Sequence, residues 1–338
     1  MPVLGASDNP RRRFQNRRVD TTQSARNGQE ILFEKDQTIM TRTYTRQQEE
    51  TLSYFRKHAE RWGEAAKGSE KQDINVIQQR NNYVLDVIGQ REVTKMMLDV
   101  GCGTGELVCD AARCGVHATG VDFAQEMIQI AQDNARNDCL ESAQFVSSSI
   151  FDFDIQADRY DLISANGFIE YISFEQLREF LSAAHRGLLK GGSIVLGSRN
   201  RLFNLFSLND FTTSEMKDGT ISHLLREAVA IVNCVNLDDL SALKTAPLAQ
   251  HDETQTQTGI DVFIRYQYTP VQLIHILGNH GFQTVHLAPI HIHAISPKLK
   301  SKYPDLHYNL SNLLQSFGMD NRELIPIASS FMIHATKS

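Results

Sequence analysis

The residues best suited to chemistry form one turn, in which an acid precedes three glycines at alternate positions. These residues are Asp99, Gly101, Cys102, Gly103 and Gly105. An apolar run, 96–100, leads into the turn, and a helical pattern, 106–113, follows it. Glycine has no β-carbon, so the backbone can approach a ligand closely, and the helix start presents N–H groups to it. The turn therefore predicts a ligand site at the end of a strand.

Two classes of ligand compete for such a turn. Dinucleotide sites use the spacing G-x-G-x-x-G and place a pyrophosphate at the helix start. Here the third glycine of that pattern would fall on Glu106, whose carboxylate repels a pyrophosphate. Asp99 also argues against a dinucleotide, because an acid at the site favours a cationic ligand. S-adenosylmethionine carries a sulfonium and an ammonium group, so it fits.

With the residues that follow, the turn resembles the first motif of class I S-adenosylmethionine-dependent methyltransferases. Asp122 lies 23 residues after Asp99, at the end of the next apolar run. The resemblance implies that Asp122 accepts hydrogen bonds from the ribose hydroxyls and that Phe123 and Met127 lie near the adenine. It also implies a seven-stranded Rossmann-like methyltransferase sheet with the last strand antiparallel, and an insertion after strand five.

Two later segments extend the resemblance. The run 160–171 resembles the fourth motif, so Asn166, Gly167 and Phe168 are expected beside the sulfonium. Segment 187–192 resembles the turn before strand five, and the match covers roughly 90–198, continuing weakly through 265–338.

The pattern departs from the family after strand three. An acid often bonds the adenine amino group there, and Ser149 takes its place. The Ser149 hydroxyl or the Ile150 N–H can contact the ring instead, or Asp152 is the acid shifted by three residues.

Arg80, ahead of the first motif, resembles an arginine that quinone-type small-molecule methyltransferases place near the cofactor carboxylate. Its other interpretation is a solvated helix arginine.

Residues that could act on the acceptor are fewer. An oxygen or carbon acceptor can need a general base, whereas a neutral amine does not. We predict that Glu170 and Tyr171 line the acceptor pocket and that His223 and His251 could reach the acceptor from an insertion. Arg199 and Asn200, after strand five, are similar candidates. The late histidines predict no metal site, because the alternating pair at 291 and 293 has no carboxylate partner that we can place.

The elements that position these residues alternate between strands and helices. Short apolar runs occur at 96–100, 118–121, 144–147, 160–165, 193–197, 284–293 and 330–336. Such alternation predicts an α/β fold with a doubly wound, mostly parallel sheet. Helices are expected at 44–62 and 73–89, and capping boxes at Ser173 with Gln176 and at Thr269 with Gln272 predict two more. Gly191 and Gly281 are the expected helix stops.

The chain divides into three parts on this interpretation. Residues 1–40 form a disordered basic tail, 41–90 an N-terminal helical lid, and 91–338 the methyltransferase domain. Segment 199–268 does not follow the strand–helix repeat, with a helix over 220–243 and a polar loop over 244–260. We interpret it as an insertion that covers the substrate.

Composition narrows the function without naming it. The chain has 338 residues, 34 basic and 40 acidic side chains, and a net charge of −6. That charge argues against a nucleic-acid partner. No apolar run approaches the roughly 20 residues of a membrane span, and five cysteines without a CxxC pair indicate a reducing, cytoplasmic setting. The sequence does not indicate an oligomeric state.

The fourth motif reads Asn-Gly-Phe-Ile rather than the Asn/Asp-Pro-Pro-Tyr of enzymes that methylate protein or DNA nitrogens. The resemblance therefore implies S-adenosylmethionine-dependent methyl transfer to an oxygen or nitrogen of a small polar molecule, such as a sugar, a nucleotide-linked sugar or a secondary metabolite. The alternatives are a non-catalytic cofactor-binding or scaffold protein and an RNA methyltransferase that uses the basic tail.

Overall fold

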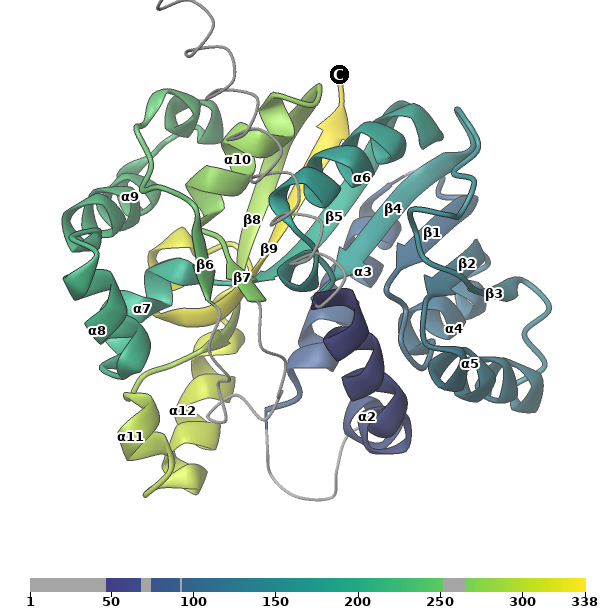
Figure 1. Ribbon diagram of the computed structural model, residues 1–338, viewed down its shortest axis with the longest axis horizontal. Helices are drawn as coiled ribbons and strands as arrows, with labels where there is room; N and C mark the ends of the chain where they lie inside the picture. The colour runs from purple at the N-terminus through teal and green to yellow at the C-terminus, as the bar shows by residue number, and fades with distance from the viewer. Residues whose placement is uncertain (1–46, 68–73, 92, 252–264) are drawn as a thin grey trace, which may run out of the picture. The chain divides into compact units, whose positions relative to one another are not determined.

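One seven-stranded sheet organises the chain. The computed structural model describes residues 47–67, 74–91, 93–251 and 265–338, so the predicted basic tail, 1–40, lies outside the described residues. The strand order is β3-β2-β1-β4-β5-β9-β8 (Figure 1). The strands are β1 (Met96–Val100), β2 (His117–Asp122), β3 (Ala143–Ser147), β4 (Tyr160–Asn166), β5 (Leu188–Arg199), β8 (Phe282–Ile292) and β9 (Ala328–Lys337).

The strand directions confirm the expected topology. The first five strands pair in parallel, and β9 pairs antiparallel with both β5 and β8. Strand β8 therefore runs in the same direction as β5. The carboxyl ends of β1, β2, β4, β5 and β8 consequently meet at one edge of the sheet, where ligands bind in open α/β folds.

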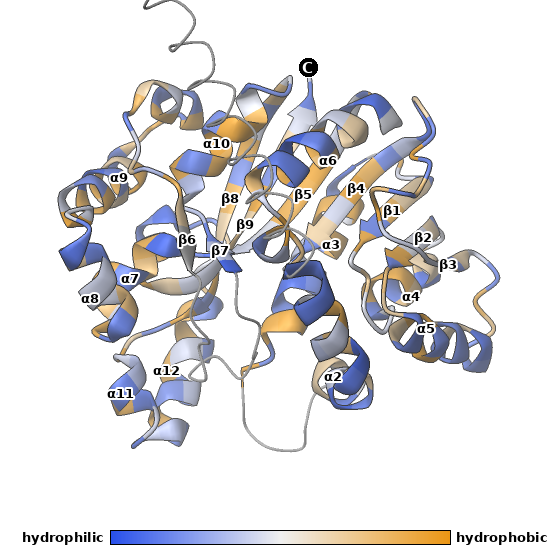
Figure 2. Cartoon of the chain, viewed as in Figure 1, coloured by the Kyte–Doolittle hydropathy of each residue, from blue (hydrophilic) through white to orange (hydrophobic). Residues whose placement is uncertain are grey.

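Successive side chains of the central strands point to opposite faces of the sheet, and each face packs into its own apolar core. Met97 packs into the core that includes α3 and α4, whereas Leu98 packs into the core that includes α6 and α10. The central strands therefore carry apolar residues on both faces of the sheet, and Figure 2 shows these strands in the colour of hydrophobic residues. The covering helices are α3 (Val76–Gln90), α4 (Glu106–Arg113), α5 (Gln125–Asn137), α6 (Phe174–Gly187) and α10 (Pro270–Gly278).

Both predicted capping boxes are present. Ser173 and Gln176 cap α6 reciprocally, and Thr269 and Gln272 cap α10. The predicted stop of the first of these helices was wrong: α6 ends at Gly187 rather than near Gly191. The reason is tertiary, because Leu188 already pairs with Tyr160 of β4 and is fully buried.

Two helical segments precede the sheet, roughly as expected. Residues 47–57 are helical, a turn interrupts the helix at His58, and α2 (Ala59–Lys67) continues it. The prediction of one helix over 44–62 missed this break, and α3 begins three residues later than predicted.

The insertion after β5 contains more structure than the sequence suggested. The helix predicted over 220–243 ends at Asn233 as α9 (Ile221–Asn233), and a 3-10 helix, Leu237–Ala242, follows. The predicted loop 244–260 contains β6 (Ala249–His251), which pairs with β7 (Arg265–Gln267). Two short helices, α7 (Asn204–Ser207) and α8 (Asp210–Lys217), were not predicted. Their apolar positions are too few to produce a periodic signal.

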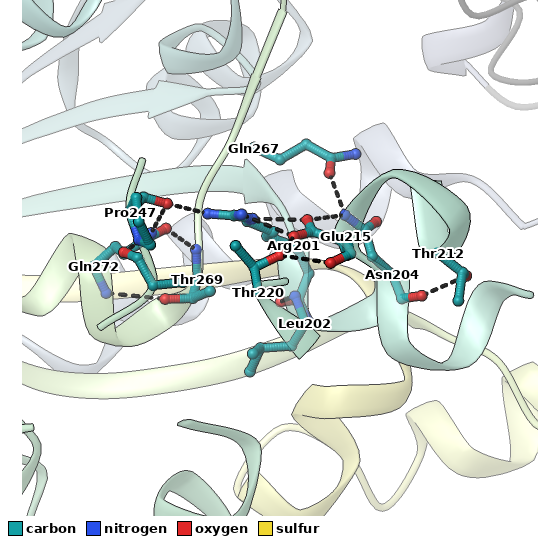
Figure 3. A network of polar contacts seen from close by, with 12 residues as sticks. Arg201, Leu202, Asn204, Thr212, Glu215, Thr220, Pro247, Gln267, Thr269 and Gln272 are labelled. Carbon is teal, nitrogen blue, oxygen red and sulfur yellow. Dashed lines mark hydrogen bonds and ion pairs between the residues drawn. The ribbon is translucent and has the colours of Figure 1, made fainter. Parts of the chain in front are cut away.

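A buried polar network holds separate segments of this insertion together (Figure 3). Arg201 Nε and Nη2 each donate to a Glu215 carboxylate oxygen at 2.8 Å, and both side chains are 2% exposed. Asn204 Nδ2 donates to Glu215 Oε1 and to Gln267 Oε1, both at 2.9 Å. Thr220 donates to the other Glu215 oxygen. The start of the insertion is therefore held to α8 and β7 by charge-assisted hydrogen bonds.

Between β8 and β9 the chain forms α11 (Pro297–Lys300) and α12 (Pro304–Gln315), followed by a 3-10 helix, Arg322–Ile327. These helices were not predicted from the sequence. Helix α12 lies against β8.

Candidate functional site

The glycine turn connects the end of β1 to α4 and has the backbone that the sequence predicted. Gly101, Gly103 and Gly105 all have positive φ, at 69°, 53° and 83°. A β-carbon at Gly105 would lie 2.6 Å from the Phe145 ring and 2.7 Å from Ala131. The turn therefore needs glycine both for its conformation and for its close packing.

Cys102 fills space inside this turn. Its Sγ would lie 2.7 Å from a β-carbon at Gly120 in β2, so the two residues pack as a small pair. Burial raises the pKa of the Cys102 thiol well above its usual range, and Asp122 and Asp99 raise it further. The thiol is therefore protonated at neutral pH and is no nucleophile.

Two buried acids flank the turn at the ends of β1 and β2. Asp99 is 4% exposed and accepts a hydrogen bond from Ser164 Oγ at 2.5 Å. Asp122 is 8% exposed and accepts from the N–H groups of Gly103 at 3.1 Å and Ala124 at 2.9 Å. The Asp122 carboxylate thus contacts the glycine turn directly, and Asp99 lies two residues before the first glycine of that turn.

The electrostatics of the two acids favour a cationic or hydrogen-bond-donating ligand. Burial raises the pKa of Asp99 to about 7, against the Ser164 hydrogen bond and with help from Asp122 and Glu106. Burial also raises the pKa of Asp122 to about 6, although its backbone hydrogen bonds oppose the rise. A positive group beside them would favour their ionised forms.

The fourth motif reaches this turn from β4. A β-carbon at Gly101 would lie 3.3 Å from the Phe168 ring, so that ring covers the start of the glycine turn. Gly167 has a φ of 70°, and a β-carbon there would lie 2.5 Å from Arg80 Nη1. Arg80 is thus directed at the predicted site and is not a solvated helix arginine. Asn166 Nδ2 faces Asn81 at 3.4 Å.

Glu170 is held by two arginines. Arg199 donates to it from its backbone N–H at 3.0 Å and from Nε at 2.8 Å, and Arg80 Nη2 lies 3.4 Å from the same carboxylate. Glu170 is 2% exposed. Its lone pairs are largely occupied, so the geometry suits a residue that positions the arginines better than a general base.

Tyr171 lies in the same cluster. Burial raises the pKa of its phenol, and Glu170 raises it further, so the hydroxyl keeps its proton at neutral pH. Arg199 and Arg265 both hydrogen-bond to Tyr171. Arg265 is 2% exposed in β7 and was missed by the sequence analysis, since nothing in its local pattern marks it.

The helices before the sheet contribute an aromatic cover that the sequence analysis also missed. A β-carbon at Gly103 would lie 3.7 Å from Trp62 Nε1. The Phe55 ring meets the rings of Trp62 at 5.4 Å and Tyr171 at 5.5 Å, each edge to face. Met127, expected near an adenine, is 1% exposed and packs with Phe123 in this same cluster. The presence of the chain's single tryptophan in a predicted lid was the available signal.

The segment after β3 adjoins Asp122. The Ser148 N–H donates to the Asp122 carbonyl at 2.9 Å. The Ser149 hydroxyl accepts from the Phe151 N–H at 3.3 Å, and Ile150 is buried. Asp152, the alternative acid, is exposed. The position of the loop is compatible with ring contacts from Ser149 or Ile150.

The two predicted histidines do not join this group. His223 lies in the first turn of α9, and its ring contacts Arg226 at 3.1 Å. Figure 1 shows α9 and β1 on opposite sides of the view. The backbone of His251 pairs with Arg265 in the β6–β7 ladder, but its side chain lies outside the described part of the chain.

Comparisons with known proteins agree with the geometry. Residues 97–192 match a family model described as a methyltransferase domain. A ubiquinone biosynthesis O-methyltransferase of Alkalilimnicola ehrlichii is 26% identical over 221 residues, covering 59% of this chain and 83% of that protein. A protein of the same name from Vibrio atlanticus is 26% identical over 233 residues, covering 68% and 84%.

The fold has counterparts among solved structures. Magnesium protoporphyrin IX methyltransferase from Synechocystis, solved with bound S-adenosylhomocysteine, gives a TM-score of 0.50 at 14% identity, covering 85% of this chain and 97% of that one. Of the helices described here, none combines the length and apolar character that crossing a membrane requires.

Proposed function

We propose that this S-adenosylmethionine-dependent methyltransferase, whose residues 97–192 match the methyltransferase domain, methylates a hydroxyl oxygen of a small polar molecule. The observation that carries the proposal is the glycine turn with its two buried acids, Asp99 and Asp122, closed by the Phe168 ring. These residues fit the cofactor: Asp99 would face its ammonium group, Asp122 its ribose, and Arg80 its carboxylate. Bound there, the cofactor supplies an activated methyl group.

The residues beyond Phe168 support a polar acceptor. Glu170, Tyr171, Arg199 and Arg265 gather at the ends of β5 and β7, where an acceptor would meet the methyl group. Their charged and hydroxyl groups suit sugar or nucleotide-linked hydroxyls better than a prenyl chain. The relatives named O-methyltransferase support oxygen rather than nitrogen as the acceptor atom.

Alignment and exclusion of water are the contributions that these side chains would make. In-line displacement needs the acceptor oxygen close to the methyl carbon, so fixed hydrogen-bond donors accelerate the step. The protonated Tyr171 and the fixed Arg199 can donate to the acceptor. Phe55 and Trp62 would cover the cofactor, so we propose residues 47–67 as the lid. The five cysteines are free, which supports a reducing compartment such as the cytoplasm.

The test is methyl transfer from labelled S-adenosylmethionine to a panel of sugars, nucleotide-linked sugars and phenols. We expect label in at least one hydroxyl compound and none with Asp99→Asn. Calorimetry with S-adenosylhomocysteine, the demethylated product, separates the alternatives. Absence of binding at millimolar concentration refutes the cofactor site, whereas binding without turnover of any acceptor supports a non-catalytic protein.

A further inference from the structure

Three histidines come together at the end of β8, outside the glycine turn. His291 is the penultimate residue of that strand, His293 is the first residue after it, and His307 lies in the first turn of α12. One ring nitrogen from each lies within 4.8 Å of those of the other two. The Nε2 atoms of His291 and His307 are 3.0 Å apart. From the sequence a metal site at His291 and His293 would need a carboxylate partner; the structure brings a third histidine, His307, to them instead.

The backbone at His291 brings two of these rings together. Its φ is 54°, a left-handed conformation that few residues other than glycine adopt. In a regular strand the Cα atoms of residues two apart are roughly 6.6 Å from each other. The ring centroids of His291 and His293 are 4.2 Å apart, so the two rings lean towards each other. Local strain of this kind tends to occur at functional sites.

Burial leaves polar atoms of the cluster unsatisfied. The three histidines are 8%, 8% and 2% exposed in chain order. By distance and angle, neither ring nitrogen of His293 has a hydrogen-bond partner among the described residues, apart from a weak interaction with the backbone of Ile295. His291 is fixed by Ser329 Oγ, 3.1 Å from its Nδ1, which leaves Nε2 directed at the cluster. A buried imidazole without partners is costly unless something binds it.

We propose that His291, His293 and His307 bind a divalent transition-metal ion of the zinc type, with one coordination position left open. Zn–N distances of about 2.0–2.1 Å place the ligand nitrogens of a tetrahedral site about 3.3–3.4 Å apart. The separation of 3.0 Å between His291 and His307 is close to that value. Three protein ligands with a fourth position open are typical of catalytic rather than structural zinc sites. Ser329 bonds the second nitrogen of His291, in the place that a carboxylate, a backbone carbonyl or a water usually takes.

The surroundings favour an anionic fourth ligand. Lys300 lies near enough to His291 and His293 to act on both rings electrostatically. Arg80 adds positive charge at His291. With these cations nearby, a bound metal ion would prefer hydroxide or an ionised oxygen at its open position.

The location of the three histidines in the fold indicates a role for the metal ion in the methyl transfer. Strand β8 runs parallel to β5, so the cluster lies at the same sheet edge as the predicted cofactor site. Arg80 links the two places, because its guanidinium donates to Ser330 Oγ at 2.8 Å, next to Ser329. The open position could bind the acceptor hydroxyl and lower its pKa. This role, unlike the metal site itself, rests on the proposed function.

Titration of the metal-free full-length chain with Co²⁺ tests the site without relying on activity. We expect visible absorption bands of a four- or five-coordinate ion that saturate at one equivalent and disappear when Zn²⁺ is added. His307→Gln and His293→Gln should each weaken Co²⁺ binding at least about tenfold. The matched control is His117→Gln, because His117 is exposed at the start of β2. It should titrate like the parent chain.

Several results would overturn the metal site. No visible bands with the parent chain would do so, even if a variant failed to fold. Bands retained in both glutamine variants would place the ion elsewhere, and an intense thiolate charge-transfer band would place it on cysteine. The role in the reaction is tested separately: His307→Gln should bind S-adenosylhomocysteine normally but lose turnover. If the parent chain does not bind S-adenosylhomocysteine, the proposed function fails while the metal site stands on its Co²⁺ spectrum.

Discussion

The raised pKa of Asp99 leads to a prediction of proton release on ligand binding, which can be measured without knowing the acceptor. The pKa of this buried carboxyl is raised to about 7, chiefly by burial. A ligand that places an ammonium group beside Asp99 favours its ionised form and lowers that pKa. S-adenosylhomocysteine carries this group, so we predict that it displaces a proton from Asp99 when it binds below pH 7.

The size of the effect follows from the pKa. At pH 6 a group with a pKa of about 7 is about 90% protonated, so binding should release about 0.9 proton from Asp99. Asp122, with its pKa raised to about 6, can add up to about half a proton at this pH. At pH 8 Asp99 is already ionised and release should be close to zero. Asp99 alone makes binding about tenfold weaker at pH 6 than at pH 8, about 1.4 kcal/mol.

Without ligand, the effect of pH on the free energy of unfolding has the opposite sign to its effect on ligand affinity. The folded pKa of Asp99 lies above its model value of 3.8, so the fold favours the protonated form. Its contribution to the free energy of unfolding is therefore present at low pH and is lost as the pH rises from about 4 to about 7. The ligand restores this stability at neutral pH, so the rise in Tm on adding S-adenosylhomocysteine should be larger at pH 8 than at pH 6.

Calorimetry in two buffers with different ionisation enthalpies measures the released protons at pH 6, 7 and 8. Asp99→Asn should reduce the release at pH 6 to the part due to Asp122. Ser164→Ala is the matched control, because it removes the hydrogen bond that lowers the pKa of Asp99. That variant should shift the transition in affinity to higher pH. An affinity that does not change between pH 6 and pH 8, with no proton release, would refute the role of Asp99.

Three further predictions concern the turn, the insertion and the lid. Gly105→Ala should abolish cofactor binding and destabilise the fold by about 2 kcal/mol or more in denaturant unfolding, because its β-carbon meets Phe145 and its φ is positive; a normal Tm would contradict this. Glu215→Gln should lower the free energy of unfolding by about 3–5 kcal/mol, since it leaves Arg201 buried without its counter-charge; a loss below 1 kcal/mol would show that the network is unimportant. Trp62 is the single tryptophan of the chain and lies at the glycine turn, so S-adenosylhomocysteine should change its fluorescence saturably, and an unchanged spectrum at saturation would remove Trp62 from the site.

The parts of the fold that were predictable are those with a short-range physical signal. The strand β1 was predicted with its observed limits because the run 96–100 is apolar except for Asp99 and ends directly before the glycine turn. The capping boxes at Ser173 and Thr269 succeeded for the same reason, since side chain and backbone partners lie three residues apart. The limits of α6 failed because strand pairing of Leu188, a long-range contact, overrode the local pattern.

The residues of the candidate site form the same two groups: those marked by a local sequence pattern, and those that elements distant in sequence bring together. Asp99 and Asp122 could be predicted because each follows an apolar run and the spacing matches a known motif. His307 and Arg265 could not, because each is brought to its cluster by an element distant in sequence, α12 or β7. The role of Glu170 was also hidden, because its two arginine partners come from α3 and β5. Their convergence depends on the strand order, which no local pattern encodes.

The charges gathered around the glycine turn are separated in a way that matches a zwitterion. Asp99 and Asp122 place two carboxyls at the ends of β1 and β2, while Arg80 and Arg199 surround the single carboxylate of Glu170 at the ends of β4 and β5. Arg265 belongs to the same cluster, so three arginines surround one glutamate and positive charge is in excess there. An amino acid group lying across the turn, with its ammonium towards Asp99 and its carboxylate towards Arg80, would meet the opposite charge at both ends. A dinucleotide carries no ammonium for Asp99 and brings a pyrophosphate towards Glu106, so the charge pattern itself selects between the two ligand classes that share this fold.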